Sequence, residues 1–257
     1  MTEPGRRVVL VTGGSQGIGA AIVAAFSEIG DSVISADLQP GQHGSGVDTM
    51  ICDFVDPTAA SRLVSHAVNL HGRIDVVVNN VGIAPYRDSF LDVTDDGWQH
   101  SIEINLMTMV RLCRAAIPVM VQAGRGAIVS IASDVARQPD PFFVDYAMTK
   151  AALVSVSKSL SKEFGAFGIR VNTVSPGPTR TSALIGEGAF ADQLARQLGV
   201  TRDAAIDHFV HSMRKLPLGH LVEAADVAAV VVFLASDVAN SITGSDYSVN
   251  AGSIVGI

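Results

Sequence analysis

Residues 8–19 read VVLVTGGSQGIG, a short β-branched run that passes into glycines and then into an Ala-rich segment. Glycines at a strand-to-helix turn permit positive φ angles and let a pyrophosphate approach the backbone at the positive end of the helix dipole. The spacing is Gly-x3-Gly-x-Gly, which differs from the commoner Gly-x-Gly-x2-Gly dinucleotide fingerprint. The segment predicts a dinucleotide-binding turn, with a tight turn that binds nothing as the alternative. Its candidate cofactor-binding residues are Gly13, Ser15, Gln16, Gly17, Ile18 and Gly19.

The rest of the chain repeats this alternation of strand and helix. Apolar runs predict strands at residues 8–11, 33–36, 49–52, 75–78, 127–131, 170–174 and 247–249. Segments of helical period lie at residues 17–29, 57–71, 98–122, 146–164 and 224–234. Pro57 suits the first turn of its helix, because its missing N–H would have no partner there. The central runs are continuously apolar, as strands buried on both faces require, so we expect an α/β fold with a doubly wound parallel sheet and helices on both faces.

The chain length and composition favour a single domain over residues 1–257. Of the 257 residues 48% are hydrophobic, and no polar or Pro-rich stretch would serve as a linker. One segment, 179–218, breaks the alternation and shows only short helical patterns near 190–198 and 204–213. Insertions of this length commonly act as lids or binding elements, so we expect a substrate lid there.

Composition also argues against several partners. The net charge of −7 and the absence of any basic run argue against nucleic acid. Two cysteines and seven histidines show no metal-binding or disulfide spacing, so we expect no metal and a reducing compartment. No signal-peptide pattern and no sufficiently long apolar stretch was found, so we expect a cytoplasmic protein that does not enter a membrane.

Asp37 stands at the end of the second predicted strand, where the adenosine ribose of a dinucleotide would lie. Its carboxylate can accept both ribose hydroxyls, whereas a 2′-phosphate near 4 Å would meet a repulsion of about 4 kcal/mol per charge pair. No Arg or Lys stands in the glycine loop or directly after Asp37. NAD is therefore favoured over NADP, with a solvated strand-end carboxylate as the alternative.

Tyr146 and Lys150 form a pair at i and i+4, so they project from the same face of a helix. A phenol with a pKa near 10 is a poor base at neutral pH, and an adjacent ammonium favours its phenolate form. Ser133 follows the strand 127–131 and would lie at the carboxyl edge of the sheet, where ligands of such folds bind. Asn105 lies within a long helix among apolar residues, where a buried amide needs hydrogen-bond partners. Its role is either structural or catalytic.

Taken in order, these motifs resemble the short-chain dehydrogenase/reductase family over nearly the whole chain: Thr12-Gly13-x3-Gly17-x-Gly19, Asn79-Asn80-Val81-Gly82, Asn105, Ser133, Tyr146-x3-Lys150 and Pro176-Gly177. The resemblance implies a Rossmann-like seven-stranded sheet in the order 3-2-1-4-5-6-7. It implies that Tyr146 is the acid/base, that Ser133 orients the substrate and that Lys150 also holds the nicotinamide ribose. Asn105 would join a water-linked proton relay.

The resemblance also implies further cofactor contacts. Asp53 would contact adenine, Asn79 and Gly82 would shape the cofactor cleft, and Thr181 would meet the carboxamide. The remaining cofactor candidates are Leu38, Phe54, Val81, Pro176, Gly177 and Thr179. Two departures from the family pattern, Val81 for alanine and Asn250-Ala251-Gly252 for Asp-Gly-Gly, remove no chemical group from this site.

The motifs together predict an NAD-dependent interconversion of a secondary alcohol and a ketone. The alternatives are reduction of a 3-oxoacyl thioester and a dinucleotide sensor without catalysis. Candidate substrate-binding residues are Ser133, Val135, Phe143, Tyr146 and Leu184, and the apolar insertion suggests a hydrophobic small molecule. The resemblance further implies a homotetramer, or a homodimer, assembled through helices 98–122 and 146–164 and the last strand.

Overall fold

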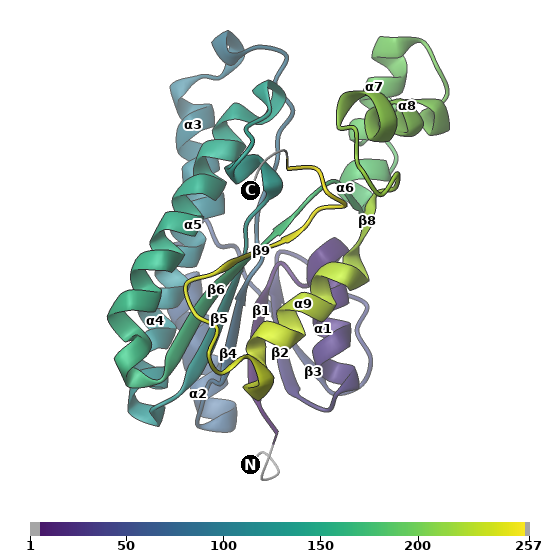
Figure 1. Ribbon diagram of the computed structural model, residues 1–257. Coiled ribbons are helices and arrows are strands. Elements are labelled where there is room, and N and C mark those ends of the chain that lie inside the picture. The colour runs from purple at the N-terminus through teal and green to yellow at the C-terminus, as the bar shows by residue number, and fades with distance from the viewer. Residues whose placement is uncertain (1–5, 255–257) are drawn as a thin grey trace.

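The computed structural model describes residues 6–254, which build one large parallel sheet (Figure 1). Seven strands lie in the order β3-β2-β1-β4-β5-β6-β9, and every neighbouring pair is parallel. This confirms the predicted fold class and strand order, with β9 as the seventh strand. The strands are β1 (Val8–Thr12), β2 (Ser32–Asp37), β3 (Val47–Ile51), β4 (Val76–Asn79), β5 (Gly126–Ile131), β6 (Ile169–Pro176) and β9 (Asp246–Val249).

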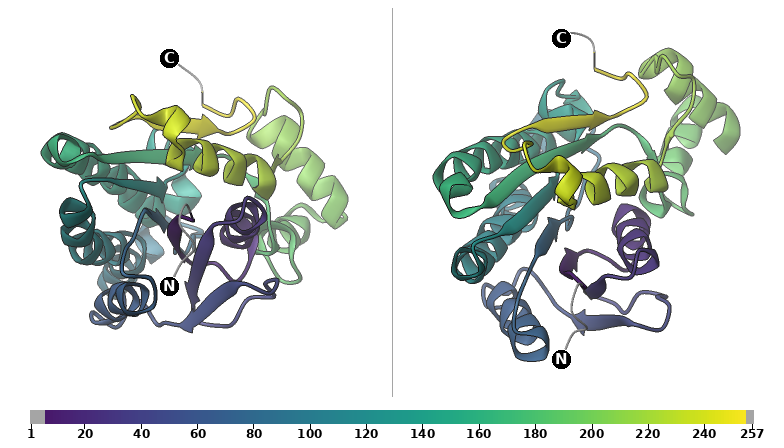
Figure 2. Two further views of the ribbon diagram at one scale, coloured as in Figure 1. Left: turned by 90° about the horizontal axis from the view of Figure 1, so that it is seen from below. Right: turned by 60° about the horizontal axis from the view of Figure 1, so that its bottom comes forward.

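Helices cover both faces of the sheet (Figures 1 and 2). On one side lie α1 (Gly17–Glu28) and α9 (Ala224–Ala235), and on the other α2 (Ala59–His71), α4 (Thr108–Ala123) and α5 (Val144–Phe164). Successive side chains of a strand point to opposite faces. In β1, Val9 and Val11 therefore join the core under α1 and α9, while Leu10 joins the core under α2 and α4. The continuous apolar run arises because both sides are buried.

The insertion after β6 forms a separate lobe beside the sheet edge (Figure 1). It contains β7 (Thr179–Arg180), α6 (Ser182–Ile185), α7 (Phe190–Leu198), α8 (Arg202–His208) and a π-helical turn (Phe209–Met213), and it ends at β8 (Val222–Glu223). The expected helical patterns are present. No strand was predicted in this segment, but β7 pairs in parallel with β8. Two-residue strands leave no periodic signal in a sequence.

Each helix predicted outside the insertion differs from the observed one by one to three residues at one or both ends. The long helix begins at α3 (Asp95–Ile102), where Thr94 accepts a hydrogen bond from Gly97 N at 3.2 Å, and a π-helical turn (Glu103–Met107) joins it to α4. The placement of Pro57 within a helix was wrong, because α2 begins at Ala59. The Asp56 carboxylate instead accepts from Thr58 N at 2.8 Å, which holds the chain in a turn before the helix.

Short 3₁₀ turns complete the described chain at Phe90–Asp92, Asp134–Ala136, Pro141–Phe143, Gly165–Phe167 and Asp237–Ala239. Contrary to the expectation that no apolar stretch is long enough for a membrane, the continuous helical run Asp95–Ala123 meets that requirement by length and composition alone. Its α4 part packs against α2 and the strands, and Leu112 and Met120 are fully buried there. This run is therefore a core helix of a sheet protein.

Candidate active site

The turn between β1 and α1 can be built only with glycines. Gly13 and Gly17 have positive φ angles of 66° and 56°, which side chains other than glycine rarely adopt. A Cβ at Gly19 would collide with the backbone oxygen of Gly13 and with the amide of Asn80. The glycine spacing thus serves a close backbone approach and an exposed helix start, which are the features that a dinucleotide phosphate site requires.

Asn80 holds this turn in place. Its Nδ2 donates to Thr12 O at 3.1 Å and to Gly13 O at 2.9 Å, and its backbone N donates to Thr12 Oγ1 at 3.1 Å. The loop after β4 is therefore fixed to the loop after β1. Sequence reasoning did not select Asn80, although the residue stands inside the quoted Asn79-Asn80-Val81-Gly82 motif.

The N-terminus of α1 remains available for an anion. Its N-cap residue, Gln16, makes no side-chain capping bond, so the first N–H groups of the helix have no side-chain acceptor. Ser182 Oγ donates to Gln16 Oε1 at 3.1 Å, and a Cβ at Gly17 would lie 3.3 Å from Thr181 Cγ2. The start of the insertion therefore closes over the glycine turn.

Asp37 lines a cleft of about 540 Å³ beside this turn; the other lining residues are Ser15, Gln16, Ala20, Leu38, Gln39, Pro40 and Gln42. Its Oδ2 accepts from Ser15 N at 2.9 Å and from Ser15 Oγ at 2.7 Å, and its Oδ1 accepts from Leu38 N at 2.7 Å. These bonds fix the carboxylate at the mouth of the cleft. An adenosine ribose entering the cleft would meet an oriented anion.

Tyr146, Ser133 and Lys150 come together at the carboxyl edge of the sheet. The Ser133 hydroxyl lies near enough to the Tyr146 phenol to lower its pKa, and Lys150 Nζ lies 5.5 Å from the centre of the Tyr146 ring. Lys150 is 3% exposed and donates to Ile131 O at 2.7 Å. Because β1 and β5 are both parallel members of the sheet, this group and the glycine turn lie at the same edge.

Burial governs the acidity of both ionisable groups. It raises the pKa of Tyr146 to about 12, while the Ser133 hydrogen bond lowers it and the nearby Asp134 carboxylate raises it. Burial also lowers the pKa of Lys150 to about 8. A cation placed beside this phenol would favour the phenolate, since an opposite charge stabilises the charged form.

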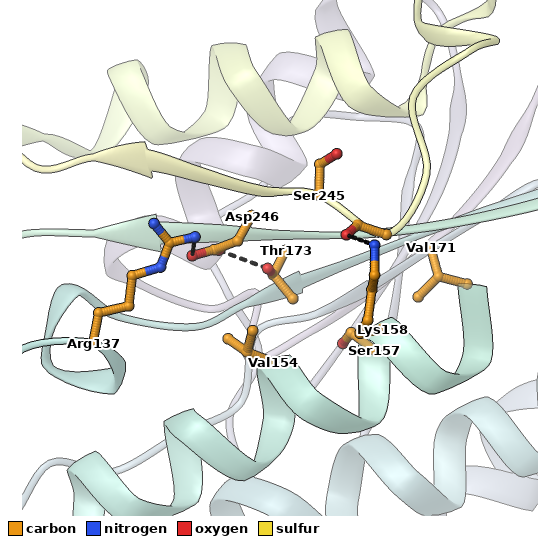
Figure 3. A pocket seen from close by; sticks show the side chains of 9 residues that line it. Arg137, Val154, Ser157, Lys158, Val171, Thr173, Ser245 and Asp246 are labelled. Carbon is orange, nitrogen blue, oxygen red and sulfur yellow. Dashed lines mark hydrogen bonds and ion pairs between the residues drawn. The ribbon is translucent and has the colours of Figure 1, made fainter. Parts of the chain in front are cut away.

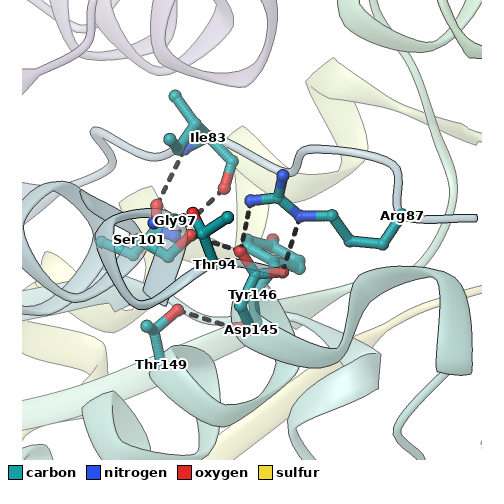
Figure 4. Close-up of polar contacts among 9 residues, drawn as sticks. Ile83, Arg87, Thr94, Gly97, Ser101, Asp145, Tyr146 and Thr149 are labelled. Carbon is teal, nitrogen blue, oxygen red and sulfur yellow. Dashed lines mark hydrogen bonds and ion pairs between the residues drawn. The ribbon is translucent and has the colours of Figure 1, made fainter. Parts of the chain in front are cut away.

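Asn105 lies in the π-helical turn and is 1% exposed. Its Oδ1 accepts from Ile83 N at 2.8 Å and its Nδ2 donates to Ile83 O at 3.1 Å. The two dashed lines that end at Ile83 in Figure 4 mark these hydrogen bonds. A Cβ at Gly82 would lie 3.1 Å from Asn105 Oδ1 and 3.4 Å from Lys150 Nζ, so Asn105, Gly82 and Lys150 meet at one point.

The start of α5 is anchored by a buried carboxylate. Asp145 is fully buried and accepts from Arg87 Nη2 at 2.6 Å and from Ser101 Oγ at 2.7 Å. Figure 4 shows both side chains converging on it. Although burial raises the pKa of Asp145, the Arg87 and Ser101 hydrogen bonds outweigh it and hold the pKa below its usual value. This anchor fixes the residue directly before Tyr146.

Asp134, which sequence reasoning missed, occupies the other side of Ser133. The residue is 3% exposed. Its carboxylate accepts from Ser133 Oγ at 3.2 Å, from Ser253 Oγ at 2.5 Å and from Arg214. Arg214 follows the π-helical turn of the insertion, and Ser253 lies near the end of the chain. The sequence spacing of these residues gives no sign that they meet.

Aromatic rings extend from Tyr146 into the insertion. The ring of Phe143 lies 6.5 Å from that of Tyr146 and 6.2 Å from that of Phe190, between ring centres. Tyr86 stacks on Phe142 at 5.1 Å. Of the other predicted substrate residues, Val135 is buried beside Ser133, and Leu184 packs partly buried against the core under α1 and α9.

The side chains of two predicted cofactor residues, Asn79 and Phe54, are buried in the core. Asn79 Nδ2 donates to Ser130 Oγ at 3.0 Å and to Cys113 Sγ at 3.6 Å, so its amide lies inside the α4 core. Phe54 is buried in the same core, while Asp53 is exposed.

Contacts with the last strand, β9, and with the segment after it position the backbone of residues 176–179. Gly177 N donates to Val249 O at 3.0 Å, and a Cβ at Gly177 would lie 2.8 Å from the Cα of Asn250. Thr179 Oγ1 donates to Gly177 O at 2.8 Å. These contacts fix the chain that leads from Pro176 to Thr181 against the segment after β9.

A second hollow of about 160 Å³ lies between α5, β6 and β9, away from the predicted catalytic residues (Figure 3). Its charged groups already have partners: Arg137 pairs with Asp246 at 2.9 Å, and Lys158 Nζ donates to the backbone oxygen of Gly244 at 2.8 Å. Thr173 Oγ1 also donates to Asp246 at 2.6 Å. This hollow has no contact with Tyr146 and is not the candidate site.

Comparison with known proteins agrees with this geometry. The sequence model of a family described as Enoyl-(Acyl carrier protein) reductase matches residues 13–253. The curated protein Oxidoreductase UcpA of Escherichia coli O157:H7 is 32% identical, covering 96% of this chain and 94% of its own. The chain belongs to the short-chain dehydrogenase/reductase family. Its members are oxidoreductases that bind a nicotinamide dinucleotide.

Solved structures of the same fold include enzymes with named activities. The aldohexose dehydrogenase of Thermoplasma acidophilum superposes with a TM-score of 0.87 at 28% identity, covering 98% of this chain and 96% of that one. A 3-ketoacyl-(acyl-carrier-protein) reductase from Brucella melitensis, complexed with NADH, has a TM-score of 0.83 at 25% identity, covering 97% and 98%. Relatives of this short-chain dehydrogenase/reductase therefore act on different substrates.

Proposed function

We propose that this protein is an NAD-dependent enzyme that interconverts a secondary alcohol and a ketone. The observation that carries the proposal is the meeting of Tyr146, Ser133 and Lys150 at the edge of the sheet that also holds the glycine turn. A binding protein without catalysis has no use for a phenol, a hydroxyl and a buried ammonium in one place. This arrangement favours the enzyme over the sensor.

The residues around the turn fit a dinucleotide. The free N–H groups of α1 suit the pyrophosphate, Asp37 suits a ribose with both hydroxyls free, and Lys150 suits the second ribose. Gly82, Val81 and Thr181 border the space between them. The nicotinamide, when bound, accepts a hydride from the alcohol or donates one to the ketone.

NAD is the proposed partner because Asp37 is held as a fixed anion. Both of its oxygens accept bonds from the chain itself, so the carboxylate cannot turn away from a 2′-phosphate. In the part of the chain that the structure describes, no Arg or Lys lines this cleft to offset the charge. The repulsion would reach about 4 kcal/mol per charge pair near 4 Å.

The side chains of the candidate site each have a separate role in the proton transfer. In alcohol oxidation, the Tyr146 phenolate takes the hydroxyl proton as the hydride leaves the carbinol carbon. Ser133 hydrogen-bonds the reacting oxygen, and Lys150 favours the phenolate. Asn105, fixed to Ile83, holds the helix turn next to Lys150 and supports a proton path to solvent. In ketone reduction, Tyr146 returns the proton to the oxygen.

The aromatic rings favour a hydrophobic substrate. Phe143 and Phe190 extend from the Tyr146 ring toward the insertion, and these rings offer large apolar surfaces. We further propose a cytoplasmic location, because both cysteines are buried free thiols, as a reducing compartment allows. We expect a homotetramer or a homodimer.

The alternative reaction is reduction of a 3-oxoacyl thioester. The 3-ketoacyl-(acyl-carrier-protein) reductase from Brucella melitensis favours it, because its structure holds NADH. A carrier protein of acidic surface would require a basic docking face. The net charge of −7 on this chain disfavours that partner, so we keep the secondary alcohol as the first proposal.

The test is a set of initial rates read by nicotinamide absorbance. NAD and NADP are each combined with 1-phenylethanol, cyclohexanol, D-glucose and lactate, and NADH and NADPH with acetoacetyl-CoA. We expect turnover of an apolar alcohol with NAD, and Tyr146→Phe should reduce it by roughly 10²–10⁴-fold with nearly unchanged NAD affinity. Tyr247→Phe on β9 is the matched control and should keep the wild-type rate.

Each part of the proposal fails separately. Full activity of Tyr146→Phe would contradict the assignment of the acid/base. A preference for NADP would contradict the role of Asp37, and turnover of acetoacetyl-CoA alone would favour the thioester reaction. Preference for lactate would contradict a hydrophobic substrate. NAD binding without turnover of any substrate would favour the sensor.

A further inference from the structure

The Asp134 carboxylate has three donors: the adjacent residue Ser133, and Arg214 and Ser253 from distant parts of the chain. Ser133 Oγ approaches Oδ1 at 3.2 Å, and Ser253 Oγ approaches Oδ2 at 2.5 Å. Arg214 makes the third contact, an ion pair in which the two side chains are only 4% and 11% exposed. A buried carboxylate that loses its cation is left with an expensive uncompensated charge. The Arg214 guanidinium therefore compensates the negative charge of the buried Asp134 carboxylate beside Ser133.

Two acceptors compete for the single hydroxyl hydrogen of Ser133. One is Asp134 Oδ1, which lies 3.2 Å from Ser133 Oγ, and the other is the oxygen of Tyr146, whose pKa the Ser133 hydroxyl lowers. A hydroxyl has one donor hydrogen, so it can donate to only one of them at a time. An unpaired Asp134 carboxylate would attract that hydrogen strongly, whereas one already held by Arg214 and Ser253 attracts it less.

Arg214, the cation that pairs with Asp134, belongs to the insertion. It follows the π-helical turn, its backbone N donates to Phe209 O at 2.8 Å, and Leu216 just beyond is 4% exposed. Its Nη1 also lies 3.5 Å from Asp140 Oδ2, and Asp140 accepts from Phe142 N at 3.0 Å. One guanidinium thus joins the insertion to both ends of the loop between Ser133 and the start of α5.

We propose that Arg214 and Asp134 are positioning residues: Arg214, placed by the folded insertion, holds the Asp134 carboxylate and leaves the Ser133 hydroxyl free for the phenol and the substrate oxygen. The proposal rests on the proposed roles of Ser133 and Tyr146. Under this proposal, Ser133 and Tyr146 can act together only while the insertion holds Arg214 in place. Displacement of the insertion would remove the cation and direct Ser133 toward Asp134.

The charges around Tyr146 determine in which direction each substitution should shift the pKa of Tyr146. Lys150 faces its ring from the same helix, Asp134 approaches from the turn after β5, and the Asp145–Arg87 pair lies at the start of α5. Asp134 raises the pKa of Tyr146, and Arg214 is the cation paired with Asp134. Removing Arg214 should therefore disfavour the phenolate, and removing the Asp134 charge should favour it.

The titration of Tyr146 tests this without any substrate. Tyrosinate absorbance is recorded at saturating NAD, as the difference between each variant and the same variant carrying Tyr146→Phe. Arg214→Met should move the titration midpoint up by about one pH unit, while Arg214→Lys, which keeps the charge, should stay near wild type. Asp134→Asn should move the midpoint down. In the Asp134→Asn background, Arg214→Met should have little further effect.

Arg202→Met is the matched control, because Arg202 pairs with Asp192 at 2.5 Å within the same insertion and has no contact with Asp134. Its midpoint should equal that of wild type. An unchanged midpoint in a folded, NAD-binding Arg214→Met protein would overturn the proposal, as would an equal shift in the presence and absence of Asp134. Because the readout needs no turnover, this failure is distinct from a failure of the proposed reaction, which the activity of Tyr146→Phe decides.

Discussion

Lys150 carries its charge in a place that water hardly reaches. It is 3% exposed, and burial lowers its pKa from 10.5 to about 8. One pKa unit corresponds to about 1.4 kcal/mol, so the protonated form destabilises the fold by roughly 3 kcal/mol. Packing alone does not explain why a buried ammonium that destabilises the fold by this amount lies beside Tyr146. Residues that break such local rules mark functional sites. The cost itself supports the proposed role.

We therefore expect Lys150→Met to raise the free energy of unfolding near pH 7 by about 1–3 kcal/mol, less the cost of leaving Ile131 O without its donor. Between the folded pKa of about 8 and the unfolded value of 10.5, the unfolded state binds more protons. The stability of the wild type should thus rise with pH through this window, and the advantage of the variant should shrink. Urea denaturation near pH 7 and near pH 9.5 measures both; an equal difference at the two pH values would contradict the assigned cause.

For single residues, the sequence predicts contacts between residues that are close along the chain but not between residues that are distant along it. Tyr146 and Lys150 are one helical turn apart, and their spacing alone places them together. Asp134 meets Arg214 and Ser253 across sequence separations of 80 and 119 residues. Asn80 was overlooked beside Asn79, because sequence does not tell which of two adjacent amides turns toward the glycine loop and which toward the core.

At the scale of elements, the start of α5 depends on a buried ion pair. Asp145 is fully buried, and the Arg87 side chain is 23% exposed. Removing one partner of such a pair leaves a charge without compensation and costs more than the pair contributes. The same cluster joins α3, through Ser101, to the helix that carries Tyr146 and Lys150.

Asp145→Ala should lower the free energy of unfolding by about 3 kcal/mol, because Arg87 and Ser101 both lose their acceptor. It should also reduce turnover of 1-phenylethanol more than it reduces NAD affinity, since the helix start that holds Tyr146 loosens. Denaturant melts and initial rates measure the two effects. The exposed pair variant Arg202→Met should lose less than about 1 kcal/mol. A loss for Asp145→Ala no larger than this control would show that the cluster does not anchor α5.

Elements differ in how much of them a sequence reveals. The central strands were predictable because both of their faces are buried, which leaves a continuous apolar run. The π-helical turn at Asn105 was not, because its residues fit an ordinary helical period. The pairing of β7 with β8 was missed for a similar reason: each strand has only two residues, and their partnership depends on how the insertion folds back.

For the whole molecule, the order of the strands brings the loops after β1, β4, β5 and β6 to one edge, where parallel sheets bind ligands. Away from that edge, α4 and α5 cover the same face of the sheet (Figures 1 and 2). Along α5, the exposed residues Ala151, Ser155 and Ser159 recur every four positions. Small residues at this spacing let a second helix approach closely, which suits the proposed assembly through these helices.

Light scattering should therefore give a particle of four chain masses, or of two if only one contact forms. Ser155→Arg places a long charged side chain on the exposed face of α5, where close helix packing leaves no room for it, so the particle should become smaller. Ser65→Arg on the exposed side of α2 is the matched control and should keep the wild-type mass. If Ser155→Arg also kept that mass while remaining folded, α5 would lie outside the interface. Helix α4 and the last strand, β9, would then be the remaining surfaces for assembly.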